Sequence, residues 1–243
     1  MQPASSTALR KLVRAAKQLR FNLTDNRRIS YSQTGEDLLV RQVFTMLGQS
    51  RISYLDLGAN HPTRFSNTYL FYRDGSSGVS VEPDPAAQGL FRKWRPRDTL
   101  LCCGVGLTDG AADFYVMTTN TLNTFSREEA LRYQGYGNQE ILETIKVPLK
   151  PVNAILERHF RERCPNFISL DIEGMDLEIL KTLDFQRFRP EVFCIETLTY
   201  TEDKTERKLD EIIEYMKSKD YTVYADTYIN TIFVDRAAWQ RRK

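Results

Sequence analysis

The sequence contains four short apolar runs, and each of them ends at an acidic residue. The runs are ISYLD, GVSVE, NFISLD and EVFCIE, and their last residues are Asp56, Glu82, Asp171 and Glu196. Amphipathic segments with helical spacing lie between them, so strands and helices alternate along the chain. This alternation predicts a mostly parallel sheet with helices on both faces, and the apolar runs fit strands that are buried on both sides.

The remaining segments extend this pattern. Residues 99–107 are typical of a third strand, residues 112–118 of a short edge strand, and residues 221–235 of two closing strands around a polar turn. The closing pair predicts a C-terminal antiparallel hairpin. Residues 119–150 are the least regular part of the sequence, and we expect an irregular insert there that includes a short helix beside Gly135 and Gly137. Long inserts of that kind are often lids or binding loops, so it is a possible acceptor-binding lid.

Composition places the chain among ordinary globular proteins. Its 243 residues are 41% hydrophobic and 27% charged, which suits one α/β domain. The formal net charge of +2 is too small to indicate nucleic acid as the main partner. No apolar run approaches the roughly 20 residues that span a bilayer. Because the sequence shows neither a signal peptide nor a CxxC pair, we expect a cytoplasmic protein with reduced cysteines.

The charge is distributed unevenly, because residues 1–28 hold seven basic side chains and one acidic side chain. The apolar residues of this stretch fall on one side of a helix, so residues 8–20 could contact an anionic membrane surface weakly. A solvated helical extension is the alternative, and the narrow apolar stripe without an aromatic anchor favours it. We expect residues 1–28 to be a basic extension and residues 29–243 to be the main domain.

The carboxyl ends of parallel strands meet at one edge of a sheet, which is where such folds bind their ligands. The turn DLGAN, which begins at Asp56, lacks the glycines of a pyrophosphate-binding turn, and its acid would repel phosphate. Glu82 follows 26 residues later, at a position that suits hydrogen bonds to a ribose diol. An acidic turn beside a ribose site favours a cationic nucleoside, and S-adenosyl-L-methionine fits that description.

The order and spacing of these motifs resemble the FkbM-type S-adenosylmethionine-dependent methyltransferases. The matching stretches are SQTGEDLL, YLDLGANHP, FSNTYLFY, GVSVEPDP, NFISLDIEGMDLEIL and RPEVFCIET. The resemblance implies a Rossmann-like class I methyltransferase fold with a seven-stranded sheet. It also implies a small-molecule or carbohydrate acceptor, and commonly O-methylation of a hydroxyl on a sugar, a glycan or a natural product, as in polysaccharide biosynthesis.

The predicted cofactor-binding residues are Gln33, Asp56, Gly58, Asn60, Glu82, Cys103, Gly104 and Asp171. By resemblance, the residues of the DLGAN turn would line the methionine and ribose parts of the cofactor, and Glu82 would hold the ribose hydroxyls. Cys103 and Gly104 would lie beside the adenine. Gln33 and its neighbours would fold over the cofactor, which is compatible with capping of the helix that follows.

Methyl transfer to a hydroxyl requires a group that removes the hydroxyl proton. Asp171 and Glu173 are two residues apart and would point the same way on a strand, so both are candidates. They could instead cap the following helix. His61, directly after the cofactor turn, is a third candidate for the base. A divalent metal held by Asp171 and Glu196 would be another way to lower the pKa of the hydroxyl.

Two other functions are compatible with an α/β sheet of this kind. One is a nicotinamide-dependent oxidoreductase, and DLGAN in place of a phosphate-binding fingerprint speaks against it. The other is a nucleoside-binding protein without activity, and the set of Asp56, Glu82 and Asp171 argues against that. The sequence leaves the acceptor, the general base, the metal requirement and the oligomeric state open.

Overall fold

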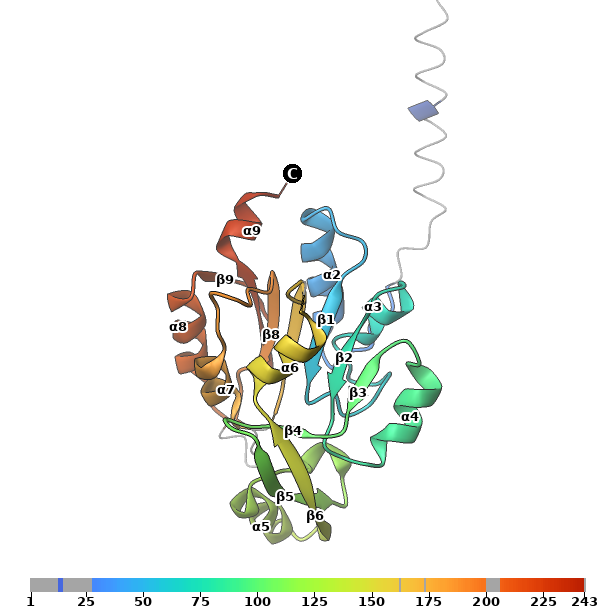
Figure 1. The fold of residues 1–243 in the computed structure, drawn as a ribbon, viewed down its shortest axis with the longest axis vertical. Coiled ribbons are helices and arrows are strands. Elements are labelled where there is room, and N and C mark those ends of the chain that lie inside the picture. Colours follow the sequence, from blue (N-terminus) through green and yellow to red (C-terminus); the bar gives the residue numbers. More distant parts are fainter. Residues whose placement is uncertain (1–12, 15–27, 162, 173, 200–205, 243) are drawn as a thin grey trace, which may run out of the picture.

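The four apolar runs form four neighbouring parallel strands at the centre of a seven-stranded sheet (Figure 1). The strands are β1 (Ser53–Leu57), β2 (Ser77–Val81), β3 (Thr99–Leu101), β7 (Phe167–Leu170), β8 (Val192–Glu196), β9 (Tyr221–Asp226) and β10 (Asn230–Asp235). The computed structural model describes residues 13–14, 28–161, 163–172, 174–199 and 206–242. The strand order is β3-β2-β1-β7-β8-β10-β9, in which β10 is antiparallel to both of its neighbours. The predicted sheet and its closing hairpin are therefore confirmed.

Alternation along β1 divides its side chains between two cores. Leu55 and Leu57 belong to one hydrophobic cluster, and Tyr54 belongs to the cluster on the other side of the sheet. Because successive residues of a strand point to opposite faces, Asp56 lies on the same face as Tyr54. Arg95 lies near both side chains, 3.9 Å from a carboxylate oxygen of Asp56 and 5.4 Å from the ring centroid of Tyr54.

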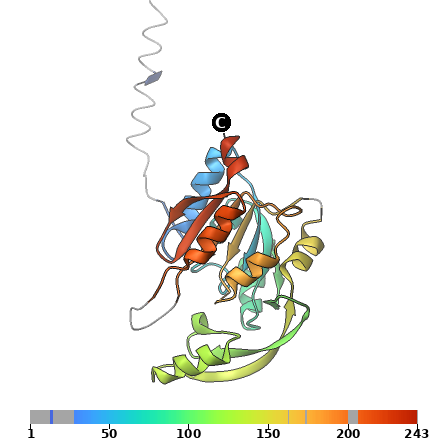
Figure 2. The ribbon, with the colours of Figure 1, turned by 90° about the vertical axis from the view of Figure 1, so that its left-hand side faces the viewer.

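Helices cover both faces of this sheet (Figures 1 and 2). Those that pack on the Tyr54 face are α2 (Glu36–Met46), α3 (Tyr69–Arg73) and α9 (Arg236–Gln240). Those that pack on the opposite face are α6 (Val152–His159), α7 (Asp176–Thr182) and α8 (Asp210–Ser218). α4 (Ala87–Trp94) contacts β3, where Phe91 packs near Leu100. The result is a three-layer arrangement that leaves the carboxyl ends of β1, β2, β7 and β8 free of covering helices.

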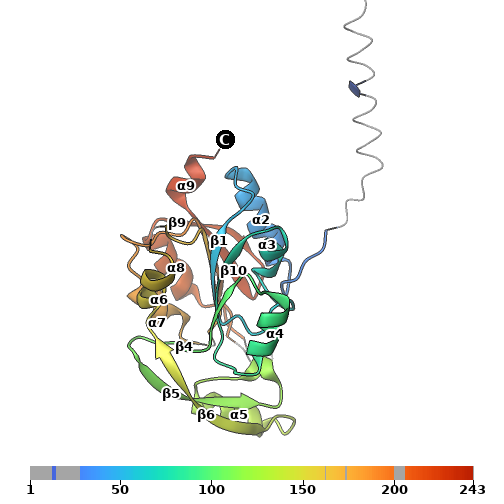
Figure 3. The same cartoon turned by 45° about the vertical axis from the view of Figure 1, so that its right-hand side comes forward.

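A second, three-stranded sheet lies at that end of the main sheet (Figures 2 and 3). It consists of β4 (Gly104–Val105), β5 (Gly110–Met117) and β6 (Ile141–Lys150), in the order β4-β6-β5. The connection from β5 to β6 contains the 3-10 helix η1 (Asn120–Leu122) and α5 (Arg127–Gly135). This sheet closes the space beyond the strand ends.

Two of the expectations for this region are wrong. The strand predicted over residues 99–107 breaks after Leu101, so β3 stays in the main sheet and β4 joins the second one. The second is the irregular insert: the short helix expected in residues 119–150 is α5, but the segment is more regular than expected, because it also contains η1 and the ten residues of β6. The pairing partners of β6 are distant in sequence, and a local pattern does not reveal them. A lid function for this segment stays a prediction.

The basic N-terminal extension lies outside the described residues, apart from residues 13–14 and 28. The domain boundary and the membrane-surface contact of residues 8–20 therefore stay predictions. Within the described ranges, no helix is both long enough and apolar enough to cross a bilayer.

Candidate functional site

A cavity of about 570 Å³ lies between the carboxyl ends of the central strands and the second sheet. Its volume is within the range of small-molecule sites. The lining contains all but one of the predicted cofactor residues, namely Gln33, Gly58, Asn60, Glu82, Cys103, Gly104 and Asp171. The exception is Asp56. The second sheet and its connection contribute an apolar wall that includes Phe114, Leu122, Phe125 and Leu149.

The turn after β1 can only be built with glycine at position 58. Gly58 has a φ of 82°, and a Cβ placed there would lie 1.7 Å from the carbonyl oxygen of Asp171. Its N–H and that of Ala59 donate to the carbonyl of Val81, at 3.1 and 3.0 Å. The turn is therefore pressed between β2 and the end of β7, and it brings the backbone of Asn60 to the rim of the cavity.

Glu82 is the acid that best fits a bound ribose. It is 6% exposed and lines the cavity. One carboxylate oxygen accepts the N–H of Asn60 at 2.7 Å, and the other accepts the N–H of Asp84 at 2.8 Å. Burial raises the pKa of Glu82 to about 7, although these two backbone donors lower it. Each oxygen retains a further lone pair, which hydroxyl donors of a ligand can satisfy.

Asp171 presents a buried oxygen for which the structure supplies no partner. Its Oδ1 is enclosed and accepts no hydrogen bond, while the residue lines the cavity. Burial and then the carboxylate of Asp176 raise the pKa of Asp171 well above its ordinary value, and a hydrogen bond with Glu196 opposes that shift. An unpartnered buried acceptor is costly, so a donor supplied by a ligand would stabilise it.

The loop that carries Asp171 is braced by Asp176, the first residue of α7. Asp176 is 3% exposed, and its carboxylate accepts the N–H groups of Ile172 and Gly174, both at 3.2 Å. Burial raises the pKa of Asp176 to about 6. Glu173, a predicted catalytic residue in this loop, lies outside the described residues.

Asp56 lies away from the cavity lining. It is 4% exposed, accepts a hydrogen bond from the hydroxyl of Thr68 at 2.5 Å, and lies 3.9 Å from a guanidinium nitrogen of Arg95. Burial raises the pKa of Asp56, and the positive charge of Arg95 opposes the increase. Arg95 is itself 1% exposed and pairs with Asp98 at 2.6 Å. These contacts give Asp56 an internal partner, and its contact with the cofactor stays a prediction.

His61, the third candidate for the base, is not among the residues that line the cavity. Its Nδ1 accepts the backbone N–H groups of Thr63 and Arg64, both at 3.1 Å. Because Nδ1 is an acceptor, the neutral ring carries its proton on Nε2. Burial and then the charge of Arg64 lower the pKa of His61. The structure thus shows His61 as the organiser of a turn, and its catalytic role stays a prediction.

The segment that carries Gln33 is held in place by two acids that are fully buried. Asp37 accepts hydrogen bonds from the hydroxyl of Ser30 at 2.6 Å and the N–H of Tyr31 at 2.7 Å. Glu36 accepts one from the hydroxyl of Thr227 at 2.7 Å, in the turn between β9 and β10. These bonds fix residues 30–37 against the end of the sheet, so that Gln33 reaches the cavity.

The metal prediction has limited geometric support. Asp171 and Glu196 line the same cavity and share a hydrogen bond. Among the described residues, no group of three or more His, Cys, Asp or Glu side chains is placed to hold a metal ion. A divalent metal at this pair stays a prediction.

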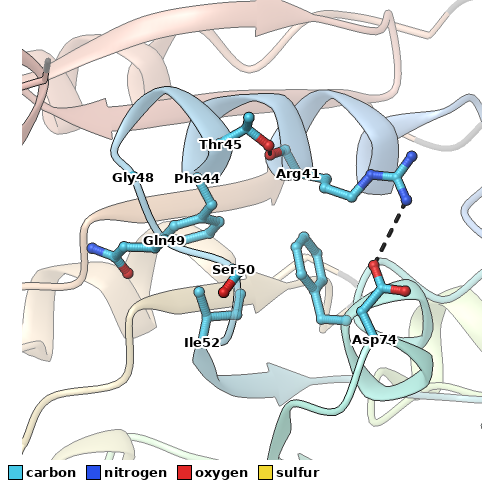
Figure 4. Close-up of a pocket in the computed structure, with 9 residues that line it drawn as sticks. Arg41, Phe44, Thr45, Gly48, Gln49, Ser50, Ile52 and Asp74 are labelled. Atoms are coloured by element: carbon cyan, nitrogen blue, oxygen red, sulfur yellow. Dashed lines mark hydrogen bonds and ion pairs between the residues drawn. The ribbon is translucent and has the colours of Figure 1, made fainter.

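A second cavity, of about 310 Å³, lies at the other end of β1 (Figure 4). It is bounded by the last turns of α2 and the segment that leads into β1, and it includes Phe44, Ile52 and Phe71. At its rim Arg41 and Asp74 approach to 3.7 Å. It contains none of the predicted site residues, and it lies at the amino end of the strand, away from the edge where ligands of parallel sheets bind.

Residues 56–223 match the family model of the methyltransferase FkbM domain. The chain belongs to this family. The match includes Asp56, Glu82, Asp171 and Glu196, and it agrees with a strand order in which one antiparallel strand closes a parallel sheet. The protein is therefore an S-adenosylmethionine-dependent methyltransferase with a Rossmann-like fold. This result confirms the resemblance, the fold class, the activity class and the cofactor that the sequence predicted.

Several solved structures resemble the chain at low identity. A 1,6-didemethyltoxoflavin-N1-methyltransferase from Burkholderia thailandensis is 13% identical, with a TM-score of 0.41, and the alignment covers 97% of this chain and 92% of that one. An O-methyltransferase from Bacillus cereus is 14% identical, with a TM-score of 0.42 and coverage of 96% and 91%. No curated protein sequence matches the chain. The family assignment therefore rests on the domain match.

Proposed function

We propose that this methyltransferase transfers a methyl group to a hydroxyl of a small molecule, such as a sugar, a glycan or a natural product. The observation that carries the proposal is the Oδ1 of Asp171, which is enclosed and has no hydrogen-bond partner, in a residue that lines the cavity. A hydroxyl of the acceptor is a donor that would satisfy this oxygen. A carboxylate with a raised pKa is also a better proton acceptor than an ordinary one.

Residues at the strand ends would bind the different parts of the cofactor. Glu82 would accept hydrogen bonds from the ribose hydroxyls, and the turn at Gly58 and Asn60 would hold the part of the cofactor next to them. Cys103 and Gly104 would lie beside the adenine, and Gln33 would cover the cofactor. When bound, S-adenosylmethionine supplies an electrophilic methyl group on a positively charged sulfur.

Asp171 would take the proton of the acceptor hydroxyl on Oδ1 as the oxygen becomes a nucleophile. Asp176 would act as a positioning residue, because its carboxylate holds the loop after β7 through the N–H groups of Ile172 and Gly174. The apolar wall of the second sheet would exclude water from the reacting oxygen.

The proposal is tested by transfer of a labelled methyl group to a panel of hydroxyl-bearing acceptors, with and without a chelator. Asp171→Asn should reduce turnover at saturating cofactor by at least about a hundredfold, the lower range for loss of a general base, while affinity for S-adenosylhomocysteine changes much less. Asp113→Asn, at an exposed acid of the second sheet that pairs with Lys146, is the control. Near-normal turnover of folded Asp171→Asn would exclude Asp171 as the base, and loss of activity with chelator would favour the metal.

A further inference from the structure

The charges around the cavity restrict what the acceptor can be. Its lining contains the acids Glu82, Asp171 and Glu196, and none of the described residues that line it is Lys, Arg or His. Arg64 follows the cofactor turn but is not a lining residue. A phosphate group, or a carboxylate without the neighbouring ammonium group that the amino-acid part of the cofactor has, would face like charges here without a cationic partner, which disfavours binding. The described lining therefore selects against anionic acceptors.

The mouth of the same cavity carries apolar side chains that are exposed. Phe65, Leu107 and Met175 are 66%, 48% and 37% exposed, and all three line the cavity. They come from separate segments: the loop between β1 and α3, the loop between β4 and β5, and the loop between β7 and α7. Single exposed apolar residues are ordinary and are scattered over a protein surface. Several that gather at one cavity indicate a surface that binds a ligand.

Phe65 also has a backbone conformation that its own residue type disfavours. Its φ of 53° lies in the left-handed region, which is rare for a bulky side chain. The chain on either side is fixed: His61 holds the preceding turn through Nδ1, and the N–H of Ser66 donates to the carbonyl of Tyr31 at 2.9 Å. Strain of this kind persists when the surroundings enforce it, and it is concentrated at functional sites.

We propose that Phe65, with Met175 and Leu107, forms the acceptor subsite, and that this subsite takes an uncharged molecule with an apolar ring or hydrocarbon face. The acceptor stacks on Phe65 and directs its hydroxyl toward Asp171. His61 is a positioning residue that holds the turn before Phe65. Sugar phosphates and nucleotide sugars are poor acceptors, while neutral glycosides with an apolar group are good ones. This inference rests on the proposed function and adds the chemical class of the acceptor.

Two fluorescent probes that differ by one charge test the subsite. N-phenyl-1-naphthylamine is neutral and apolar, and 8-anilino-1-naphthalenesulfonate carries the same rings with a sulfonate. The full chain is first saturated with S-adenosylhomocysteine and titrated with each probe. The neutral probe should bind roughly tenfold or more tightly than the sulfonate. Phe65→Ala should weaken the neutral probe roughly tenfold, which corresponds to loss of a buried aromatic contact.

Tyr228→Ala is the matched control, because Tyr228 is also an exposed aromatic residue, at 61%, with a positive φ, of 76°, but does not line the cavity. It should leave the neutral probe unaffected. Met175→Arg should shift the preference toward the sulfonate.

Tighter binding of the sulfonate by the unmodified protein, or equal effects of Phe65→Ala and Tyr228→Ala, would overturn the subsite. Failure of S-adenosylhomocysteine to bind at all would instead overturn the cofactor assignment and, with it, the function on which the subsite rests.

Discussion

Glu82 makes cofactor binding depend on pH in a direction that the structure determines. In the free protein, burial raises the pKa of this carboxyl to about 7. A ribose diol donates hydrogen bonds to the ionised form, so a bound nucleoside stabilises the carboxylate and lowers its pKa. Binding is therefore strongest above pH 7 and weakens as the pH falls and Glu82 is protonated. S-adenosylhomocysteine is the suitable ligand, because it lacks the positive sulfur that would also respond to Asp171.

The magnitude follows from the ionised fraction. A group with a pKa of about 7 is about ten-elevenths ionised at pH 8 and about one-eleventh ionised at pH 6, so affinity should fall about tenfold between these values. Glu82→Gln removes the charge-assisted bonds and should weaken binding at pH 8 by roughly ten- to a hundredfold, from about 1.5–3 kcal/mol. The variant should also lose the tenfold pH dependence.

The assay is isothermal titration calorimetry of the full chain with S-adenosylhomocysteine at pH 6, 7 and 8 at constant ionic strength. Asp113→Asn serves as the charge control, because Asp113 is half exposed in the second sheet and pairs with Lys146. The reasoning is refuted if the unmodified protein binds equally well at all three pH values, or if Glu82→Gln keeps the same slope. The unmodified protein and Glu82→Gln must give the same circular dichroism spectrum. This check is needed because Glu82 also accepts the N–H groups of Asn60 and Asp84, so its replacement could disturb the fold.

Further substitutions at two places test the geometry around the cavity. Gly58→Ala should lower the melting temperature sharply and abolish S-adenosylhomocysteine binding, because its Cβ would overlap the carbonyl oxygen of Asp171. Gly137→Ala is the control, because Gly137 has a similar φ of 79° and no atom within 4 Å of an added Cβ. It should lower the free energy of unfolding, measured by denaturant titration, by only about 1 kcal/mol. Asn123 donates to Asp84 at 3.2 Å and ties the η1 segment to the loop after β2. Asn123→Asp should accelerate dissociation of S-adenosylhomocysteine in stopped-flow measurements, because it places two carboxylates against each other. Adding Asp84→Asn to this variant reverses donor and acceptor and should restore the slower dissociation. A double variant that dissociates as fast as Asn123→Asp alone would contradict this role.

The strands and the edge at which they bind ligands could be predicted because both depend on local patterns. Unbroken apolar runs with terminal acids identified β1, β2, β7 and β8 and placed Glu82 and Asp171 at one edge. The second sheet was not predictable in the same way. Gly104 pairs with Leu149 in parallel fashion, and this partnership between distant residues leaves no local signal. The breadth of the apolar wall therefore became apparent only in the structure.

Arg95 illustrates a second limit. A charged residue is rarely buried, so the local sequence KWRPRD gives no reason to predict that Arg95 is buried in the core. Its only local signal is Asp98, three residues later, with which it forms a buried pair. The guanidinium also lies 5.4 and 5.6 Å from the ring centroids of Tyr54 and Tyr72, which helps to hold the charge in the core.

The acids at the strand ends thus differ in the partners that the protein itself supplies. Asp56 shares its face with Tyr54 and has an internal cation, Arg95, nearby. Glu82 and Asp171 face the cavity, and no basic residue is among the described residues that line it. Uncompensated acids in a cavity raise each other's pKa values and favour a cation. The positive sulfur of S-adenosylmethionine is such a cation, so loading of the cofactor should favour the ionised form of Asp171, which is the form that can accept the acceptor's proton. A neutral acceptor then enters without adding another negative charge to the site.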